Sequence, residues 1–421
     1  MAEAVSKVKS RFNRGSYLMF TFMVITVGNS SYLTSLGIND FVNYAGIAML
    51  LAAILYDFIR YRIDGLDKRN IILFIIVEIL FSVGILLQHL VMTTKIKLLM
   101  TMVFIAAPAL LSSRLMRNFD DIRDAAYGVF LGIIVCTIIA LIGGTSLYSK
   151  VCEGMKDAGF NGGLQHKNYF AVAALLCFAV LFLYQKYVRR TALDIIVMIV
   201  SLIMIVVSIT RGAWIMTAAF LVISNMDFLE KINKKARTAC TVLFILVCCI
   251  VGAYVAKNIV FKSVTYAMRL NGFKKYLKLY SQDIFHMWFG DAEMAWQSGE
   301  TYDINVLVRL RYEGTLELVA LSVLIKNGLL GFFGYELIFV YALYSAIISR
   351  SKMYRYSILS LAGTLFLSTF IENYAVNSHI VFGIFIYCAV ASLIRMSETD
   401  CRTGEQYEIE NAKGEGCAAN A

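Results

Sequence analysis

The chain has 421 residues, of which 59% are hydrophobic and 16% charged, and its mean hydropathy is +0.70. This composition excludes an ordinary soluble domain and predicts an all-α polytopic membrane protein. The net charge of +10 is explained by basic residues in cytoplasmic loops, so it gives no reason to expect nucleic-acid binding.

Apolar runs of about 18–24 residues recur along the chain and predict about twelve transmembrane helices. The predicted spans are 17–37, 41–59, 70–92, 96–113, 125–148, 168–187, 191–209, 212–229, 238–261, 329–349, 355–375 and 378–395. Nine helices thus occupy 1–261, a large outer loop with interfacial and short helices occupies 262–328, and three helices occupy 329–396. The polar segment 397–421 is predicted to be a disordered cytoplasmic tail.

The loop charges predict that both termini are cytoplasmic. With the N-terminus inside, the inner side receives 24 of the 39 Lys and Arg residues, whereas the short outer loops receive six. The basic N-terminus is followed by a full-length span without a small-residue cleavage site, so we expect an uncleaved first helix. Most of the nine cysteines lie in apolar spans, which excludes a disulfide framework and makes structural zinc very improbable.

The loop before the sixth predicted span is rich in polar residues and glycine. Its glycines allow a sharp turn, and Asn168 or a neighbour is suited to cap the following helix. His166 has two interpretations, a ligand-facing donor or a structural residue beside a helix start.

Arg211 is predicted to lie on the outer side, where the positive-inside rule disfavours arginine. It could bind an anionic ligand, or it could extend to lipid headgroups as an interfacial anchor. Gly212 and Ala213 follow it directly, and such small residues would let a bulky anion approach the backbone.

The large outer loop supplies the densest set of ionisable residues. Residues 266–281 have Leu270, Phe273, Leu277 and Tyr280 at helical spacing, which predicts an amphipathic interfacial helix. Trp288, Trp296 and tyrosines of the loop could stack on sugar rings or anchor the loop in the membrane interface. The remaining candidates for the site are Arg269, His286, Asp291, Arg309, Arg311 and Glu313.

Glu317 opens a short apolar helix, Thr315–Ile325, that ends at Lys326-Asn327-Gly328 and cannot span a bilayer. An ionised glutamate on such a segment is costly unless it faces water or a cation, so we expect it to face an outer cavity. Arginines and a carboxylate around such a cavity suit one chemistry. The arginines would neutralise a lipid diphosphate leaving group, and the carboxylate would accept a proton from an attacking hydroxyl during glycosyl transfer.

The sequence resembles the O-antigen ligase and Wzy-type polysaccharide polymerase family of bacterial inner-membrane glycosyltransferases. Four segments carry the resemblance. Residues 165–171 are similar to a His-Pro-Asn run entering a helix, and 208–214 to a Ser-Arg-Gly-Ala-Trp signature. Residues 269–290 are similar to the start of the family's large outer loop, and 317–331 keep the spacing of its His-Asn-x-Tyr-Leu helix and closing Gly-x-x-Gly.

The resemblance implies a GT-C-like fold in the bacterial cytoplasmic membrane and a donor glycan on undecaprenyl diphosphate. It implies that Arg211 and Arg269 hold the diphosphate, and that neither a metal nor a nucleotide cofactor takes part. Two positions depart from the family pattern: Glu317 replaces a histidine, and Lys167 replaces the proline. The base could therefore be Glu317, or it could have moved to His286, Glu313 or Asp291.

The leading functional hypothesis is a polymerase of a capsule, exopolysaccharide or O-antigen. A ligase that transfers the finished glycan to lipid or protein is the first alternative. A flippase or transporter is the second, and it would need ionisable groups near the bilayer midplane, where Glu78 and Asp194 are expected to lie near helix ends. A chain-length regulator and a flippase are the protein partners that a polymerase would have.

Overall fold

The computed structural model describes residues 13–149, 158–231, 273–274, 276–278, 280–291, 318–372, 374–377 and 379–418, with backbone alone at 229–231 and 401–418. These residues are mostly helical and contain no β-strand. The predicted all-α class is therefore confirmed for the described part of the chain. The predicted span 238–261 and most of the predicted outer loop lie outside the described residues.

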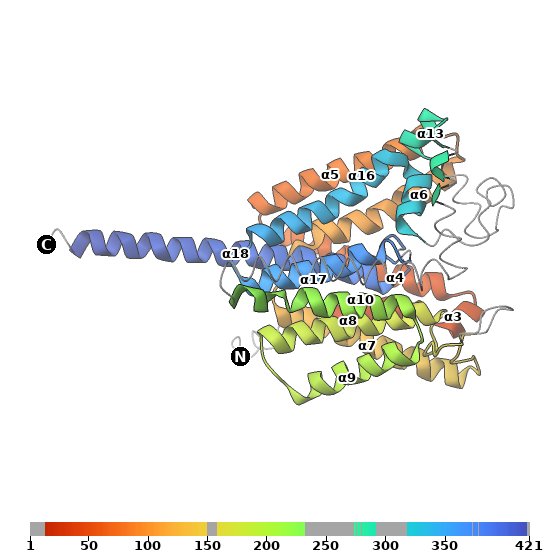
Figure 1. Cartoon of the computed structure of the whole chain (residues 1–421), viewed down its shortest axis with the longest axis horizontal. Coiled ribbons are helices and arrows are strands. Elements are labelled where there is room, and N and C mark those ends of the chain that lie inside the picture. The colour runs from red at the N-terminus through yellow and green to blue at the C-terminus, as the bar shows by residue number, and fades with distance from the viewer. Residues whose placement is uncertain are drawn as a thin grey trace, which may run out of the picture. The chain divides into compact units, whose positions relative to one another are not determined.

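Seven of the described helices are long and apolar enough to cross a membrane (Figure 1). They are Asn39–Arg60 (α4), Gly65–Leu87 (α5), Met92–Arg114 (α6 with the turns that follow it), Phe119–Ile142 (α7), Lys167–Tyr187 (α8), Val319–Ile348 (α16) and the Val381–Asp400 part of α18. Two further apolar helices are shorter, Arg14–Val27 (α2) and Ala192–Val207 (α9). These lengths support a membrane protein, while twelve spans and the orientation of the termini stay predictions.

The chain divides into two compact units. Unit 1 comprises Met1–Arg62, Arg114–Thr217 and His379–Ser392, and unit 2 comprises Ile63–Ser113, Ala218–Ser378 and Leu393–Ala421. Unit 1 contains α2, Ser31–Ser35 (α3), α4, α7, α8, α9 and the first parts of Arg211–Ser224 (α10) and Val381–Ala418 (α18). Unit 2 contains α5, α6, Ile284–Phe289 (α13), α16, Lys352–Ser368 (α17) and short turns at Ala107–Leu111 (η1) and Met226–Lys231 (η3).

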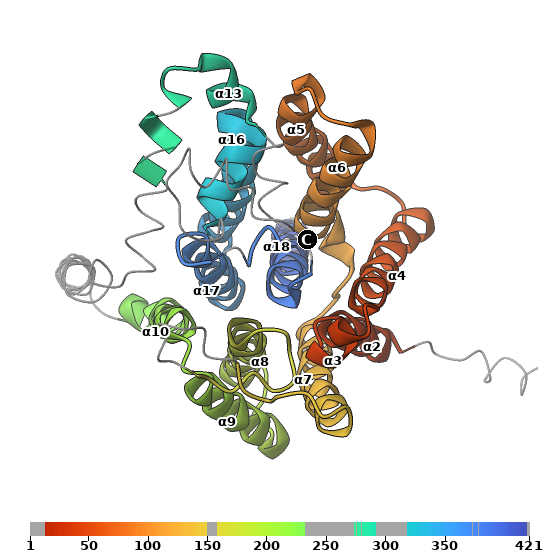
Figure 2. The same cartoon turned by 90° about the vertical axis from the view of Figure 1, so that its right-hand side faces the viewer.

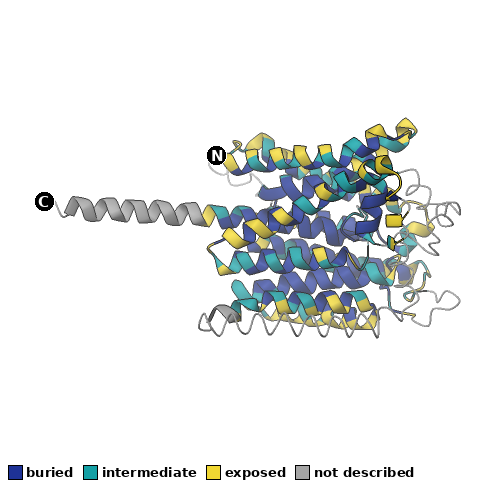
Figure 3. Cartoon of the chain, turned by 45° about the horizontal axis from the view of Figure 1, so that its top comes forward, coloured by how far each residue is buried: buried dark blue, intermediate teal, exposed yellow. Residues whose placement is uncertain are grey.

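Helix α8 forms the centre of unit 1. It packs between α7 and α9, as the view along the helices shows (Figure 2). From Phe170 to Leu181 every residue is buried, because this stretch is apolar on all sides. Other helices bury only part of their surface, and residues along them are exposed (Figure 3). On α7 and α9 the exposed residues include Leu131, Ile138, Ile196 and Ile203. Such outward apolar faces are expected where lipid replaces water.

Unit 1 has two polar ends. The end that contains Arg14, Asp57, Arg117, Arg123 and Arg189 is called the arginine end below. It holds the N-termini of α2, α7 and α9 and the C-termini of α4 and α8. The opposite end, called the loop end, is built from residues 28–31, 143–149, 158–166 and 208–211.

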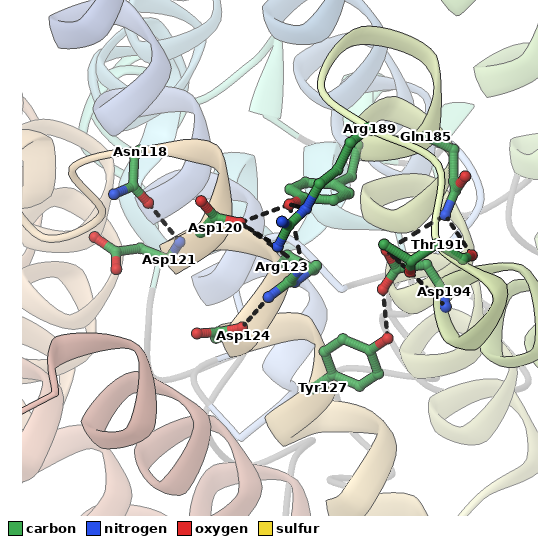
Figure 4. Close-up of polar contacts among 11 residues, drawn as sticks. Asn118, Asp120, Asp121, Arg123, Asp124, Tyr127, Gln185, Arg189, Thr191 and Asp194 are labelled. Carbon is green, nitrogen blue, oxygen red and sulfur yellow. Dashed lines mark hydrogen bonds and ion pairs between the residues drawn. The ribbon is translucent and has the colours of Figure 1, made fainter.

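Dense polar contacts close the arginine end (Figure 4). The Tyr184 hydroxyl donates to Asp120 Oδ1 at 2.6 Å and accepts from Arg123 Nη1 at 3.1 Å and from Arg189 Nε at 2.8 Å. Asp194 is 1% exposed and accepts hydrogen bonds from Tyr127 and Thr191. These charges are paired and their hydrogen bonds cap helices, so we interpret this network as structural.

Helix α16 lies against α5 in unit 2 and carries an internal break. Gly328 has φ 66° and ψ −167°, which interrupts the helix between two helical stretches. The described residues thus show an apolar helix from Val319 to a break at Gly328, next to the predicted end, while residues 315–317 of the predicted short helix lie outside them. Tyr276 and Tyr280 pack on this helix with Leu321, Leu324 and Ile325.

Several boundaries differ from the sequence prediction. The first predicted span is divided into α2 and α3, and α2 ends at Gly28, where a Cβ would lie 2.7 Å from Asn43. Helix α5 begins five residues before the predicted span, where Asp64 and Asp67 form a capping box. Helix α18 continues to Ala418, so the tail predicted to be disordered from 397 is helical there.

One individual position also needs correction. Glu78 was expected near a helix end, but it lies well inside α5, and its Oε1 atom is buried without a hydrogen-bond partner. In the segment predicted to be an interfacial helix, Leu277 is 52% exposed and Tyr276 is 2% exposed. The Tyr276 ring packs beside Tyr280 on α16.

Candidate functional site

Two helices of unit 1 begin side by side at the loop end. The Thr210 hydroxyl, directly before α10, lies 3.3 Å from Asn168 Oδ1 in the first turn of α8. Lys167 is the first residue of α8, and Arg211 is the first residue of α10. The structure thus brings together three residues that the sequence singled out: His166, Asn168 and Arg211.

A strained turn positions Arg211. Ser208 Oγ donates to the Ile205 carbonyl at 2.7 Å and accepts the Thr210 amide at 3.2 Å. Between them Ile209 has φ 52°, a left-handed conformation that is costly for a β-branched residue. Such strain is kept only where the surrounding structure enforces it, and it often accompanies a functional site.

The glycine-rich loop before α8 packs against this turn. The Phe160 amide donates to the Val207 carbonyl at 3.2 Å, and a Cβ at Gly159 would lie 2.0 Å from the Ser208 carbonyl oxygen. Gly162 and Gly163 have φ values of 57° and 79°, which confirms the predicted sharp turn. The close approach explains why glycine is required at position 159.

His166 is the N-cap residue of α8. Its Nδ1 accepts the backbone amide of Asn168 at 3.1 Å, so the cap lies two residues before Asn168. Desolvation by the packed loop, with a smaller contribution from the Lys167 ammonium, lowers the pKa of His166. The neutral ring is the form that can accept this hydrogen bond.

The charges at these helix starts favour an anion. Helix N-termini present amide N–H groups and the positive end of the helix dipole, and they bind phosphate or carboxylate groups. Here two such ends also carry the cations of Lys167 and Arg211. Cations at helix N-termini are unfavourable by themselves, so a ligand with negative charge would be stabilised by these two cations and by the helix dipoles.

The loop end also contains His379, a histidine that the sequence did not indicate. The Gln165 amide donates to the Asn29 carbonyl at 2.9 Å, and the Asn29 side chain donates to the carbonyl oxygen of His379. The buried Asn43 side chain donates to the same oxygen at 3.0 Å. Two buried amides therefore fix His379 beside the glycine-rich loop.

The ring of His379 faces two polar groups of α4. Its Nδ1 lies 3.8 Å from Asp40 Oδ1, and its Nε2 lies 3.5 Å from the Tyr44 hydroxyl. Burial lowers the pKa of His379, and the Asp40 carboxylate raises it by a smaller amount. No local sequence signal indicates this group, because its contacts are more than 300 residues away in the chain.

Two other candidates, His286 and Asp291, lie in unit 2. Asp283 caps α13 by accepting the His286 amide at 3.2 Å, and its second oxygen lies 2.5 Å from His286 Nδ1. This contact with His286 lowers the pKa of Asp283. The Asp291 amide donates to the Ile325 carbonyl at 2.6 Å, which places Asp291 beside the break in α16.

The remaining candidates lie outside the described residues: Arg269, Arg309, Arg311, Glu313 and Glu317. Within the described part of the chain, no group of three or more His, Cys, Asp or Glu side chains could hold a metal ion. Cys136, Cys177 and Cys388 are buried free thiols.

The chain matches no family model, and no curated protein matches its sequence. The fold alone defines a broad class, that of helical proteins with at least seven helices long and apolar enough to cross a membrane. The local geometry adds an anion-favouring pair of helix starts in unit 1.

Proposed function

We propose that this protein is a glycosyltransferase that polymerises a surface polysaccharide on the outer face of the bacterial cytoplasmic membrane. Its donor would be a glycan on undecaprenyl diphosphate, and its acceptor the next lipid-linked repeat unit. The observation that carries the proposal is the contact between Thr210 and Asn168, which sets the starts of α8 and α10 side by side with Lys167 and Arg211.

In the proposed reaction this pair of helix starts binds the diphosphate. The Arg211 guanidinium would pair with two phosphate oxygens, since its planar fork suits phosphate and keeps its charge at any working pH. The sequence resemblance adds Arg269 as a second arginine. As negative charge develops on the leaving diphosphate, preformed donors and cations stabilise it more than they stabilise the bound donor, which accelerates transfer.

The reaction also needs a base that accepts the proton of the acceptor hydroxyl. The acceptor oxygen bonds to the anomeric carbon, the bond from that carbon to the diphosphate oxygen breaks, and the leaving diphosphate keeps the electron pair. We assign the proton of the hydroxyl to the Glu317 carboxylate, as the sequence analysis suggests. His379 beside Asp40 is a second possible acceptor, because it lies on the same loop end as Arg211.

A ligase would use the same donor site, and nothing in unit 1 distinguishes it from a polymerase. Transport remains the other alternative, and one observation favours it. Glu78 lies inside α5 rather than near an end, and intramembrane carboxyl groups often mark substrate or proton pathways. We prefer glycosyl transfer because the anion-favouring geometry at the loop end has no counterpart in a purely intramembrane pathway.

Deletion of the gene, followed by analysis of the lipid-linked glycans and surface polysaccharide, distinguishes these three functions. Single repeat units left on the carrier, without long chains, are expected for a polymerase. Full-length chains retained on the carrier would indicate a ligase, and repeat units accumulating on the cytoplasmic face would indicate a flippase. Normal polysaccharide in the deletion strain would contradict all three.

Arg211 provides the test of the site itself. We expect Arg211→Ala to lower the transfer rate by about 10²–10³-fold, as the loss of one preformed electrostatic contact does in other enzymes. Arg211→Lys should recover only part of the rate, since lysine cannot pair bidentately. Arg190→Ala, at an exposed arginine outside the site, is the matched control for protein amount and polymer length. Wild-type polymer from the Arg211→Ala protein would exclude the diphosphate role.

A further inference from the structure

A group of arginines surrounds Tyr61 at the arginine end of unit 1. The guanidinium carbons of Arg117, Arg114 and Arg60 lie 4.8, 5.6 and 5.9 Å from the centre of the Tyr61 ring. The Arg117 guanidinium also donates to the Tyr61 hydroxyl at 2.5 Å, and Arg114 donates to the Arg62 carbonyl at 2.8 Å. We call Arg60, Arg114 and Arg117, together with the adjacent exposed residue Arg62, the Tyr61 arginine cluster.

The geometry holds like charges close together. One aromatic ring stabilises each guanidinium by only about 0.5–1 kcal/mol at an exposed site. Asp57 is 2% exposed and contacts both Arg14 and Arg117, so its single charge is divided between two cations. Arg60, Arg62 and Arg117 are exposed to the surroundings. An additional anion among these residues would relieve their repulsion.

The neighbouring surface indicates what kind of anion this is. Leu55, Tyr56 and Ile59, on the α4 turns just before Arg60, are 61%, 52% and 77% exposed. Helix α4 is one of the helices suited to cross a membrane, so this apolar face would contact acyl chains. The guanidiniums at its end then lie at the depth of lipid phosphates, which arginine recognises bidentately.

We propose that the Tyr61 arginine cluster is a binding site for the headgroup phosphate of an anionic phospholipid, whose acyl chains lie along the exposed face of α4. The Tyr61 ring contacts three guanidiniums, and the Tyr56 hydroxyl also accepts a hydrogen bond from Arg60. The site is at the opposite end of unit 1 from Arg211, so it does not depend on the proposed glycosyl transfer.

The test measures lipid-dependent stability of the full-length protein in nanodiscs. The thermal midpoint is compared in phosphatidylglycerol and in phosphatidylcholine, and retained lipid is identified by native mass spectrometry. For the wild type we expect a higher midpoint in phosphatidylglycerol and retained anionic lipid. The double variant Arg60→Gln, Arg62→Gln should lose at least half of that difference and most of the retained lipid.

Two comparisons make the test specific. The double variant Arg190→Gln, Arg350→Gln removes the same charge from exposed positions outside the cluster and should respond to phosphatidylglycerol like the wild type. Tyr61→Leu keeps every charge but removes the aromatic ring, and it should also weaken the response. If both double variants lost the stabilisation by phosphatidylglycerol equally, or if Tyr61→Leu kept it in full, the effect would be one of general surface charge. Either result would overturn the proposal. Equal stabilisation by inorganic phosphate in phosphatidylcholine would overturn the lipid assignment.

Discussion

At the scale of single residues, Ile209 shows how local strain serves the candidate site. The residue is β-branched and has φ 52°, and its side chain is 40% exposed, so burial of the side chain does not offset the cost of the conformation. The turn instead is held by Ser208 and by the packed loop at Gly159. This arrangement places Arg211 at the first position of α10.

The strain at Ile209 predicts that a suitable substitution there stabilises the protein. Asparagine adopts the left-handed conformation readily, so Ile209→Asn should stabilise the protein by about 1 kcal/mol and raise its thermal midpoint by a few degrees. Val206→Asn, at a similarly exposed position in helix α9, is the control and should lower the midpoint. Thermal unfolding in detergent measures both. A lower midpoint for Ile209→Asn would mean that the side chain, not the backbone, matters at this position.

The sequence singled out some of these residues and missed others. Arg211 and the glycines were indicated by their position between apolar runs, which local sequence records. His379 could not be found in this way, because its neighbours Asn29 and Asn43 come from the beginning of the chain. The role of His166 as a cap needed the structure, because the alternative, a ligand contact, uses the same residue type beside a helix start.

At the scale of elements, the break in α16 is the most specific feature of unit 2. Gly328 and Gly290, both with positive φ, approach so closely that a Cβ on Gly290 would lie 2.6 Å from the Gly328 nitrogen. The Gln88 side chain, at the end of α5, donates to the carbonyls of Phe289 and Lys326 at 2.8 and 3.1 Å. Three segments distant in sequence therefore meet at this junction.

This junction predicts that alanine is not tolerated at position 328. The backbone conformation there is available essentially only to glycine, and a Cβ would lie 2.3 Å from the Trp288 carbonyl oxygen. We expect Gly328→Ala to destabilise the protein by about 2–3 kcal/mol or to prevent its accumulation.

Gly363→Ala in α17 is the matched control, since its Cβ would meet only the flexible Ile223 Cδ1 atom at 3.0 Å. That change should be neutral or stabilising, because alanine is favoured over glycine inside a helix. Thermal midpoints and membrane yields of the two proteins give the comparison. Similar behaviour of the two variants would contradict a special role for the Gly328 backbone.

At the scale of the whole molecule, the charge distribution predicts which end of unit 1 faces the cytoplasm. The arginine end holds basic residues of the predicted inner loops, and the loop end holds the predicted outer segments. Ser146 and Arg190 are exposed positions at the loop end and the arginine end. Cysteines introduced at these two positions into a cysteine-free protein would show on which side of the membrane each end of unit 1 lies.

A membrane-impermeant maleimide should label Ser146→Cys in intact cells. It should label Arg190→Cys only after the membrane is permeabilised, because the positive-inside rule places that loop in the cytoplasm. Labelling of both proteins in permeabilised cells controls for accessibility. The reverse pattern would invert the topology and place Arg211 on the cytoplasmic side, which would exclude transfer from an outward-facing donor.

By itself, the sequence determined the helical class, the approximate positions of the described helices and the separation of basic segments from polar, glycine-rich segments. These properties follow from hydrophobic length and charge, which are local along the chain. The tertiary structure decided that the starts of α8 and α10 meet, the placement of His379 and the junction of Gln88 with Gly290 and Gly328. Each of these depends on backbone groups that need hydrogen-bond partners or close packing from distant segments, and local patterns do not encode which distant segment provides them.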